Sequence, residues 1–347
     1  MIKIKTEKKL FRKHQFKIMD YDVRDLYDVV DDITTLKRKY KYLTLQVDGG
    51  GQLGTIPMLN LYTMEQKLND GLKKPKQLND YFKTIWGTST GAIISGLIAI
   101  GVSTKEILTM YVEDGPAIFD RQKGGALNIF SKATYSTKFV DTLFKRYFKD
   151  MTFRTTMSNG IDLNIAVVNP ITRSTIICNI TNTPDMKLAD AIRGSMSAPM
   201  YFGPYNFLGR FRYRYPTHNI LFDGGTGNYN CTLEKSICKS MYKDGLETQD
   251  FYVHSLGCGK LQYHSDSLQN DIRHILKFRK IKQILWTLAF AREEATNRQV
   301  KWATYRAKDS GVNFRRIDAT LPKEFIKMDK TNNISKVISL VQSEMEG

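Results

Sequence analysis

Two short glycine-containing segments carry the residue types that acyl transfer needs. Residues 87–91 read GTSTG and match G-x-S-x-G, a pattern in which the serine, here Ser89, lies on a sharp strand-to-helix turn. Residues 48–54 read DGGGQLG, and the backbone N–H groups of Gly49, Gly50 and Gly51 can face a negatively charged oxygen. A serine nucleophile and N–H donors for an oxyanion are the first two requirements of ester hydrolysis.

A serine nucleophile also needs a base, and the sequence offers two candidates. Asp223 ends the strand-like run 219–222 and precedes two glycines, although Asp-Gly is also a common turn. His254 lies within the apolar run 251–256, where a histidine is more often a core residue than a catalyst. Ser89, Asp223 and His254 follow the chain order of an α/β-hydrolase triad. The residues alone leave a Ser–Asp pair and a Ser–Asp–His triad both open.

The first loop also fits the dinucleotide pattern G-x-G-x-x-G. A dinucleotide fold needs a second strand that ends in an acidic residue about twenty positions later. Residues 68–75 read LNDGLKKP, which predicts a helix end and a loop in that region. The pattern therefore disfavours a nucleotide site.

The segments around the two turns predict the elements that position them. Apolar strand-like runs precede both turns, at 42–47 and 84–86, and Leu61, Met64 and Leu68 fall on one helical face. Residues 92–100 are apolar all round, which is typical of a helix buried against a sheet. We expect a three-layer α/β fold, with a mostly parallel central sheet flanked by helices. The uncharged stretch 85–102 could span a membrane, but its serine turn and glycines favour strand, turn and buried helix.

Composition narrows the class of protein. The 347 residues include 52 Lys and Arg against 35 Asp and Glu, and the net charge of +17 favours acidic partners such as anionic lipid surfaces. No zinc-finger or RNA-binding signature accompanies the charge, so nucleic acid is not expected. The four cysteines form no C-x-x-C pair, which predicts free thiols, a reducing compartment and no metal. We also expect no cofactor, and the oligomeric state stays open.

The simplest domain division has three parts. Residues 1–41 form a basic N-terminal cap, 42–265 the catalytic domain, and 266–347 a basic helical C-terminal extension packed on that domain. The lysine-rich start lacks the apolar core of a secretory signal, so we expect a cytoplasmic protein that associates peripherally with membranes.

Taken together, the motifs resemble the patatin-like phospholipase family. That family carries D-G-G-G-x-R-G, then G-x-S-x-G, then a distant D-G-G or D-G-A, and this chain has all three in order at 48–54, 87–91 and 223–225. Residues 191–199 are similar to the family's A-x-R-A-S-x-A-A-P segment, and 255–259 to its S-x-G-T-G. The likeness covers roughly residues 42–260.

The resemblance implies a Ser–Asp dyad, with Ser89 as nucleophile, Asp223 as base and His254 uninvolved. The amides of Gly49, Gly50 and Gly51 would hold the oxyanion while an acyl-enzyme forms from a membrane glycerophospholipid. An aspartate is a weak base at neutral pH, so we expect a dry, apolar setting to raise the pKa of Asp223. Residues 195–202, with Met196, Met200, Tyr201 and Phe202, are the expected wall for an acyl chain.

Two departures from the family pattern concern rate and substrate range. Leu53 replaces the basic residue that in the family helps to fix the first loop, and residues 229–231 read YNC where the family has N-N-P. These departures leave room for a weakly active or gated enzyme, including a triggered membrane-degrading effector. They also leave room for a lipid-binding or signalling module without catalysis.

Overall fold

The computed structural model describes residues 30–118, 135, 137–199, 201–206, 220–261 and 280–321. Its centre is a sheet with the strand order β5-β6-β3-β2-β1-β7-β9, in which β4 also pairs with β3. The strands are β1 (Tyr42–Val47), β2 (Phe82–Thr88), β3 (Asp162–Asn169), β4 (Ser174–Cys178), β5 (Tyr205–Asn206), β6 (Ile220–Asp223), β7 (Phe251–Leu256) and β9 (Asn313–Ile317). A separate parallel pair joins β8 (Lys260–Leu261) to β10 (Thr320–Leu321).

The central part of the sheet is parallel, as predicted. Strands β1, β2, β3, β7 and β9 run in one direction. Strands β4 and β6 run antiparallel to β3, and β5 runs antiparallel to β6. Strand β1 is buried from its second residue to its last because helices cover both faces of the sheet, as in other parallel sheets.

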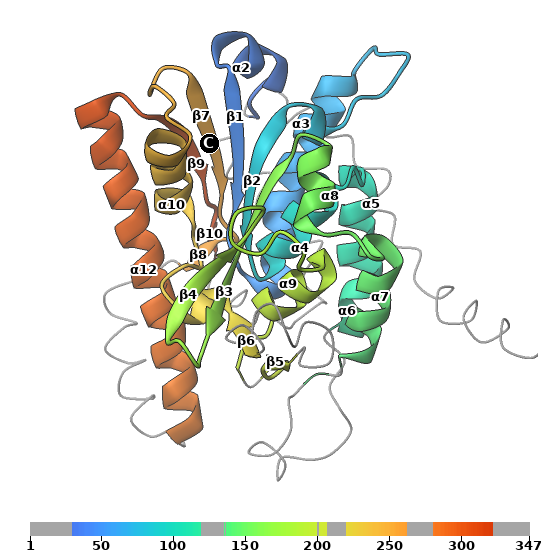
Figure 1. The fold of residues 1–347 in the computed structure, drawn as a ribbon, viewed down its shortest axis with the longest axis vertical. Helices are drawn as coiled ribbons and strands as arrows, with labels where there is room; N and C mark the ends of the chain where they lie inside the picture. Colours follow the sequence, from blue (N-terminus) through green and yellow to red (C-terminus); the bar gives the residue numbers. More distant parts are fainter. Residues whose placement is uncertain are drawn as a thin grey trace, which may run out of the picture.

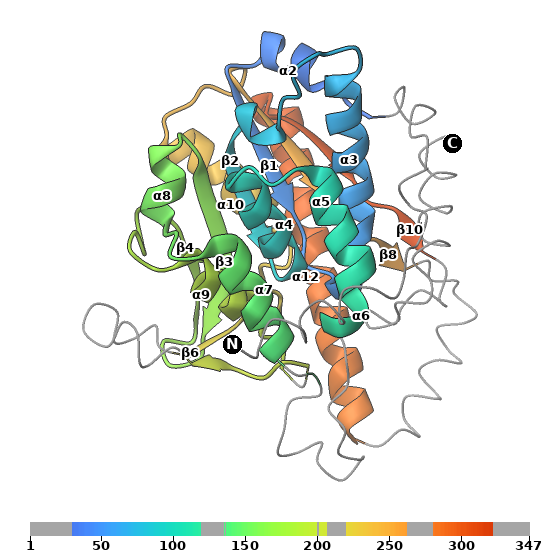
Figure 2. The ribbon, with the colours of Figure 1, turned by 90° about the vertical axis from the view of Figure 1, so that its right-hand side faces the viewer.

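Helices flank the sheet on two sides (Figure 1). The side shown in Figure 2 carries α3 (Thr55–Asn69), α4 (Thr90–Ala99), α5 (Thr104–Thr109) and α7 (Lys138–Phe148). The opposite side carries α10 (Leu233–Cys238) and the long α12 (Lys280–Ser310). Shorter helices are α2 (Ile33–Lys39), α6 (Gly115–Ile118), α8 (Phe153–Ser158) and α9 (Leu188–Ser195), with 3-10 turns at Gly51–Gly54, Leu78–Asp80 and Gly224–Thr226 and π-helical segments at Met110–Asp114 and Lys239–Lys243.

The helices next to the two glycine segments form where the sequence predicts them. Leu61, Met64 and Leu68 are buried on α3, and every residue of α4 is buried. The uncharged stretch 85–102 divides into the end of β2, the turn at Ser89 and α4. Among the described residues, no helix is both long and apolar enough to cross a bilayer.

The C-terminal part of the chain enters the sheet itself. Strand β9 pairs in parallel with β7, from Tyr252 opposite Asn313 to Leu256 opposite Ile317. The predicted boundary at residue 265 was therefore wrong as a limit of the folded core, since the segment assigned to an extension supplies an edge strand of the sheet. Most of the predicted N-terminal cap, residues 266–279 and 322–347 of the predicted extension, and Met200 lie outside the described residues.

Candidate active site

Ser89 lies on a strained turn between β2 and α4. Its backbone has φ 55° and ψ −120°, a left-handed conformation that costs a non-glycine residue free energy and is concentrated at functional sites. Glycine is required nearby, because a methyl group on Gly91 would lie 2.2 Å from the carbonyl oxygen of Val47. This close approach of α4 to β1 fixes the turn. Ser89 is half-buried at its apex.

A second serine, Ser195, binds the backbone of this turn. The backbone N–H of Ser89 donates to Oγ of Ser195 at 2.9 Å, and that Oγ donates to the carbonyl of Ala166 at 2.7 Å. Ser195 is fully buried at the end of α9. It lies in the 191–199 segment that the sequence singles out, but its link to Ser89 was not predicted.

The glycine loop lies directly against the nucleophile. A methyl group on Gly49 would lie 3.1 Å from Cβ of Ser89. However, the Gly49 amide donates to the carbonyl of Asn230 at 3.1 Å, so it is not available to an oxyanion. None of the hydrogen bonds found among the described residues uses the amide of Gly50 or Gly51. Of the three amides predicted to face an oxyanion, only those of Gly50 and Gly51 are left without a hydrogen-bond partner in the part of the chain that the structure describes. Gly51 lines the cavity described below.

Asp223 reaches the same level of the sheet from the antiparallel strand β6. Thr88 pairs with Ala166, and Asp223 pairs with Val167, so β3 separates Ser89 from Asp223 by only two strand spacings, about 10 Å between backbones. The Asp223 side chain is buried and accepts a hydrogen bond from the Gly225 amide at 2.7 Å.

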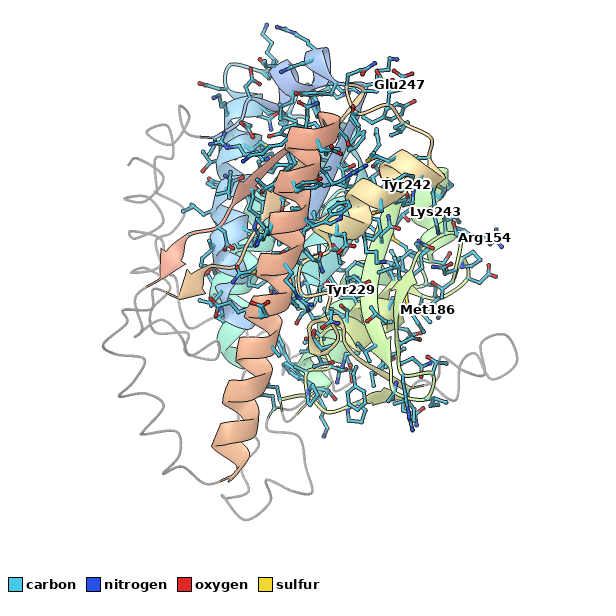
Figure 3. The ribbon with its side chains drawn as sticks, turned by 90° about the vertical axis from the view of Figure 1, so that its left-hand side faces the viewer. Arg154, Met186, Tyr229, Tyr242, Lys243 and Glu247 are labelled. Carbon is cyan, nitrogen blue, oxygen red and sulfur yellow. The ribbon has the colours of Figure 1, made fainter. Side chains whose placement is uncertain are left out.

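The loop after Asp223 hydrogen-bonds to the end of β2, to the glycine loop and to α12. Oγ1 of Thr88 donates to the carbonyl of Tyr229 at 2.7 Å, next to the Asn230 carbonyl that accepts from Gly49. On the other side, Nε2 of Gln299 donates to the carbonyl of Asn228 at 2.8 Å, which attaches this loop to α12. Figure 3 labels Tyr229 beside the middle of that helix.

A cavity of about 190 Å³ joins the predicted site residues. Ser89, Asp223 and Gly51 all line it. Most of the remaining wall is apolar and comes from α4, the π-helical segment after α5, α6, α7 and the residues around 196–202. These residues are Ile93, Met110, Tyr111, Ile118, Val140, Leu143, Phe144, Met196, Ala198, Pro199, Tyr201 and Phe202. From the expected wall at 195–202, Met196, Ala198, Pro199, Tyr201 and Phe202 line the cavity, whereas Ser195 and Ser197 do not and Met200 is not described. Ala291 of α12 also contributes.

Arg316 on β9 anchors the first residue of the glycine loop. Its Nη1 and Nη2 donate to the two carboxylate oxygens of Asp48 at 3.1 and 2.6 Å. Loss of the motif's basic residue at Leu53 therefore does not leave this loop without a charged anchor. Sequence reasoning missed Arg316, because 268 residues separate the partners and no local pattern links them.

His254 lies away from the cavity, in a separate polar cluster. Its Nε2 is 3.0 Å from Oδ1 of Asn60 on α3, and its Nδ1 is 3.3 Å from Oδ2 of Asp31. The side chain is fully buried at the middle of β7, opposite Leu45. The alternative triad through His254 was therefore wrong: the histidine has the expected chain order but sits in the wrong place.

Comparison with known proteins decides the family. Residues 45–235 match the sequence profile described as "Patatin-like phospholipase". The chain belongs to the patatin-like phospholipase family. It is 27% identical to Patatin-like protein 4 of Arabidopsis thaliana over 330 residues, covering 84% of this chain and 79% of that protein. It is 29% identical to Patatin group M-3 of Solanum tuberosum over 187 residues, covering 50% and 47%.

Two further matches differ in how much of each chain they cover. Patatin-like protein 1 of Arabidopsis thaliana is 27% identical over 240 residues, which is 62% of this chain and 58% of that protein. Among solved structures, VipD from Legionella pneumophila aligns with a TM-score of 0.38 and 11% identity, covering 88% of this chain and 67% of that one. Within the described residues, no three His, Cys, Asp or Glu side chains come together as a metal site.

Proposed function

We propose that this protein is a lipid acyl hydrolase of the phospholipase A type, which cleaves ester bonds of membrane glycerophospholipids. The observation that carries the proposal is that Ser89, on a strained turn, shares one largely apolar cavity with Asp223. Membership of the patatin-like phospholipase family supports the same class of activity.

In the proposed mechanism, Asp223 accepts the proton of the Ser89 hydroxyl as the serine attacks the ester carbonyl. The amides of Gly50 and Gly51, with the first-turn N–H of Thr90, stabilise the oxyanion, since these helix-start donors have no partner within the helix. The proton passes from Asp223 to the leaving alkoxide. Water then enters, loses a proton to Asp223 and attacks the acyl carbonyl. The ester bond between the acyl carbon and Oγ of Ser89 breaks, Asp223 returns its proton to that Oγ, and the fatty acid leaves.

The acyl chain would occupy the apolar part of the cavity. Phe144, Met196 and Phe202 offer only hydrocarbon, ring and thioether surface there. Burying each additional methylene of the chain gains about 0.8 kcal/mol. This surface suits a fatty acyl group and offers little to a polar substrate.

The substrate surface that we propose is an anionic phospholipid membrane on the cytoplasmic side. The net charge of +17 attracts anionic lipid at about 1 kcal/mol per basic residue near the bilayer. All four cysteines are free, which fits a reducing compartment. Whether a trigger gates the activity stays a prediction.

The test is release of labelled fatty acid from vesicles that contain phosphatidylcholine with or without an anionic lipid. We expect wild type to release fatty acid faster with anionic lipid and Ser89→Ala to release none above background. Ser158→Ala, which changes an exposed serine at the end of α8, is the matched control and should behave as wild type.

If wild type and Ser89→Ala release labelled fatty acid equally, the proposal that this protein is a hydrolase is rejected. If wild type cosediments with vesicles but releases nothing, the protein is a lipid-binding module instead. The rate should also fall in acid as Asp223 becomes protonated, and a profile that stays flat down to about pH 4 contradicts a raised pKa of this base.

A further inference from the structure

We propose that Arg316 is a positioning residue for ester hydrolysis, which holds the glycine loop against Ser89 through its paired hydrogen bonds to Asp48. This inference rests on the proposed function. It assigns a role in the active site to a strand that lies beyond the residues matched by the family profile.

Arg316 and Asp48 form a bidentate pair, in which two guanidinium nitrogens bind the two carboxylate oxygens. Both terminal nitrogens of Arg316 reach a different oxygen of Asp48, and both side chains are almost fully buried, at 9% and 3% exposure. Two parallel bonds fix the orientation of the carboxylate as well as its distance. A lysine at this position could supply the charge but not the fork.

Further bonds hold the guanidinium in place. Nη1 of Arg316 donates to Oγ of Ser255 at 3.0 Å, and Nη2 donates to Oδ2 of Asp318 at 2.7 Å. Gln46 also donates to Oδ1 of Asp48 at 2.8 Å. Burial by itself would lower the pKa of Arg316, but the Asp48 and Asp318 carboxylates outweigh it and raise that pKa well above its usual value. The guanidinium therefore stays charged throughout the working pH range.

The carboxylate of Asp48 belongs to the residue next to Gly49, which packs against Ser89. Asp48 directly precedes Gly49, where a methyl group would lie 2.6 Å from Oδ1 of Asn230 and 3.1 Å from Cβ of Ser89. The next residue, Gly50, is equally confined, since a methyl group there would lie 2.2 Å from Cβ of Cys258. A shift of Asp48 therefore moves the Gly50 and Gly51 amides relative to the oxygen that they stabilise. Misplacement of about 1 Å at such a site can lower the rate 10²-fold.

The adjacent residue on β9 provides a matched control. Arg315 pairs with Oδ1 of Asp31 at 2.5 Å, on the opposite face of the same strand. It has the same side chain and the same kind of partner, but its partner is not in the glycine loop. Arg315 is more exposed than Arg316, at 44% against 9%. Arg315→Lys therefore controls for an arginine-to-lysine change that breaks an aspartate pair on the same strand away from the glycine loop.

The experiment measures turnover per active site on anionic vesicles, with sites counted by complete labelling with a fluorophosphonate. For Arg316→Lys we expect kcat per labelled site to fall about 10–100-fold while KM changes by less than about threefold, which is the signature of a lost transition-state interaction. Arg315→Lys should keep the wild-type kcat. Asp48→Asn, which preserves shape and leaves Arg316 intact, should reproduce the loss. It also serves as the second variant if Arg316→Lys does not fold.

The double variant Asp48→Asn/Arg316→Lys separates positioning from general damage. If Asp48 and Arg316 act only through their contact with each other, the double variant should lose no more kcat than either single variant. Fewer labelled sites with wild-type kcat at each, or an equal loss in Arg315→Lys, overturns the positioning role while Ser89-dependent release keeps the proposed function. Equal release by wild type and Ser89→Ala overturns both.

Discussion

Two polar clusters, one almost fully buried and one partly exposed, lie on opposite faces of the same pair of strands. On one face, Ser255 and Arg316 meet Asp48 at the glycine loop. On the other, His254 and Arg315 meet Asp31. In each cluster an aspartate pairs with an arginine and accepts further hydrogen bonds. Only the first cluster adjoins a strained serine and an apolar cavity. An aspartate–arginine pair alone therefore does not mark a candidate active site, and here the adjoining cavity distinguishes the two clusters.

Of the regions compared here, the glycine loop should show the largest loss of kcat on substitution. Gly51 has φ +60° and lines the cavity, whereas Gly71 has φ +72° in an exposed loop with nothing near its missing side chain. Both alanine variants carry the strain of a left-handed alanine, about 1–2 kcal/mol. We expect Gly51→Ala to lose about 10²-fold in kcat and Gly71→Ala to lose stability only. Vesicle assays with melting curves on both variants check this, and a similar loss of kcat in the two would break the contrast.

The histidine cluster should affect stability and not turnover. His254→Asn removes ring contacts to Asn60 and Asp31 from a fully buried position. We expect a melting temperature lower by roughly 2–8 °C, since an unsatisfied buried group costs about 1–3 kcal/mol. Turnover per labelled site should stay within about threefold of wild type. Complete loss of turnover in folded protein would revive the triad.

The smallest effect concerns acid stability. Burial by itself would raise the pKa of Asp31, but the hydrogen bond from His254 and the charges of His254 and Arg315 lower it to about 2. Because the pKa is lower in the folded state, its contribution to stability is complete above about pH 4 and is lost as the pH falls toward 2. We expect the difference in melting temperature between wild type and Asp31→Asn to shrink from pH 5 to pH 3. A difference that grows in that range contradicts the sign.

Local signals made much of the fold and site predictable. The serine turn, the glycine loop and the helix after each follow from glycines and apolar periodicity within about fifteen residues, and Leu61, Met64 and Leu68 are buried as expected. The family motifs then point to Asp223, which the sheet register brings to the level of Ser89.

Long-range contacts were not predictable in the same way. The Asp48–Arg316 pair depends on β9 joining the edge of the sheet, and no spacing in the chain encodes this. The Gly49 amide was misassigned because its partner is a backbone carbonyl 181 residues away, at Asn230. Chain order could not decide between the Ser–Asp pair and the alternative triad through His254, because it carries no information about which face of a strand a side chain takes.

The most direct test of the account is the site and rate of fluorophosphonate labelling. Peptide mapping by mass spectrometry should find the adduct on Ser89. The labelling rate of Asp223→Asn should fall about 10²–10⁴-fold, because the carboxylate that accepts the serine proton is gone. An adduct on another residue, or an unchanged rate in folded Asp223→Asn, would contradict the claim that these two side chains act together.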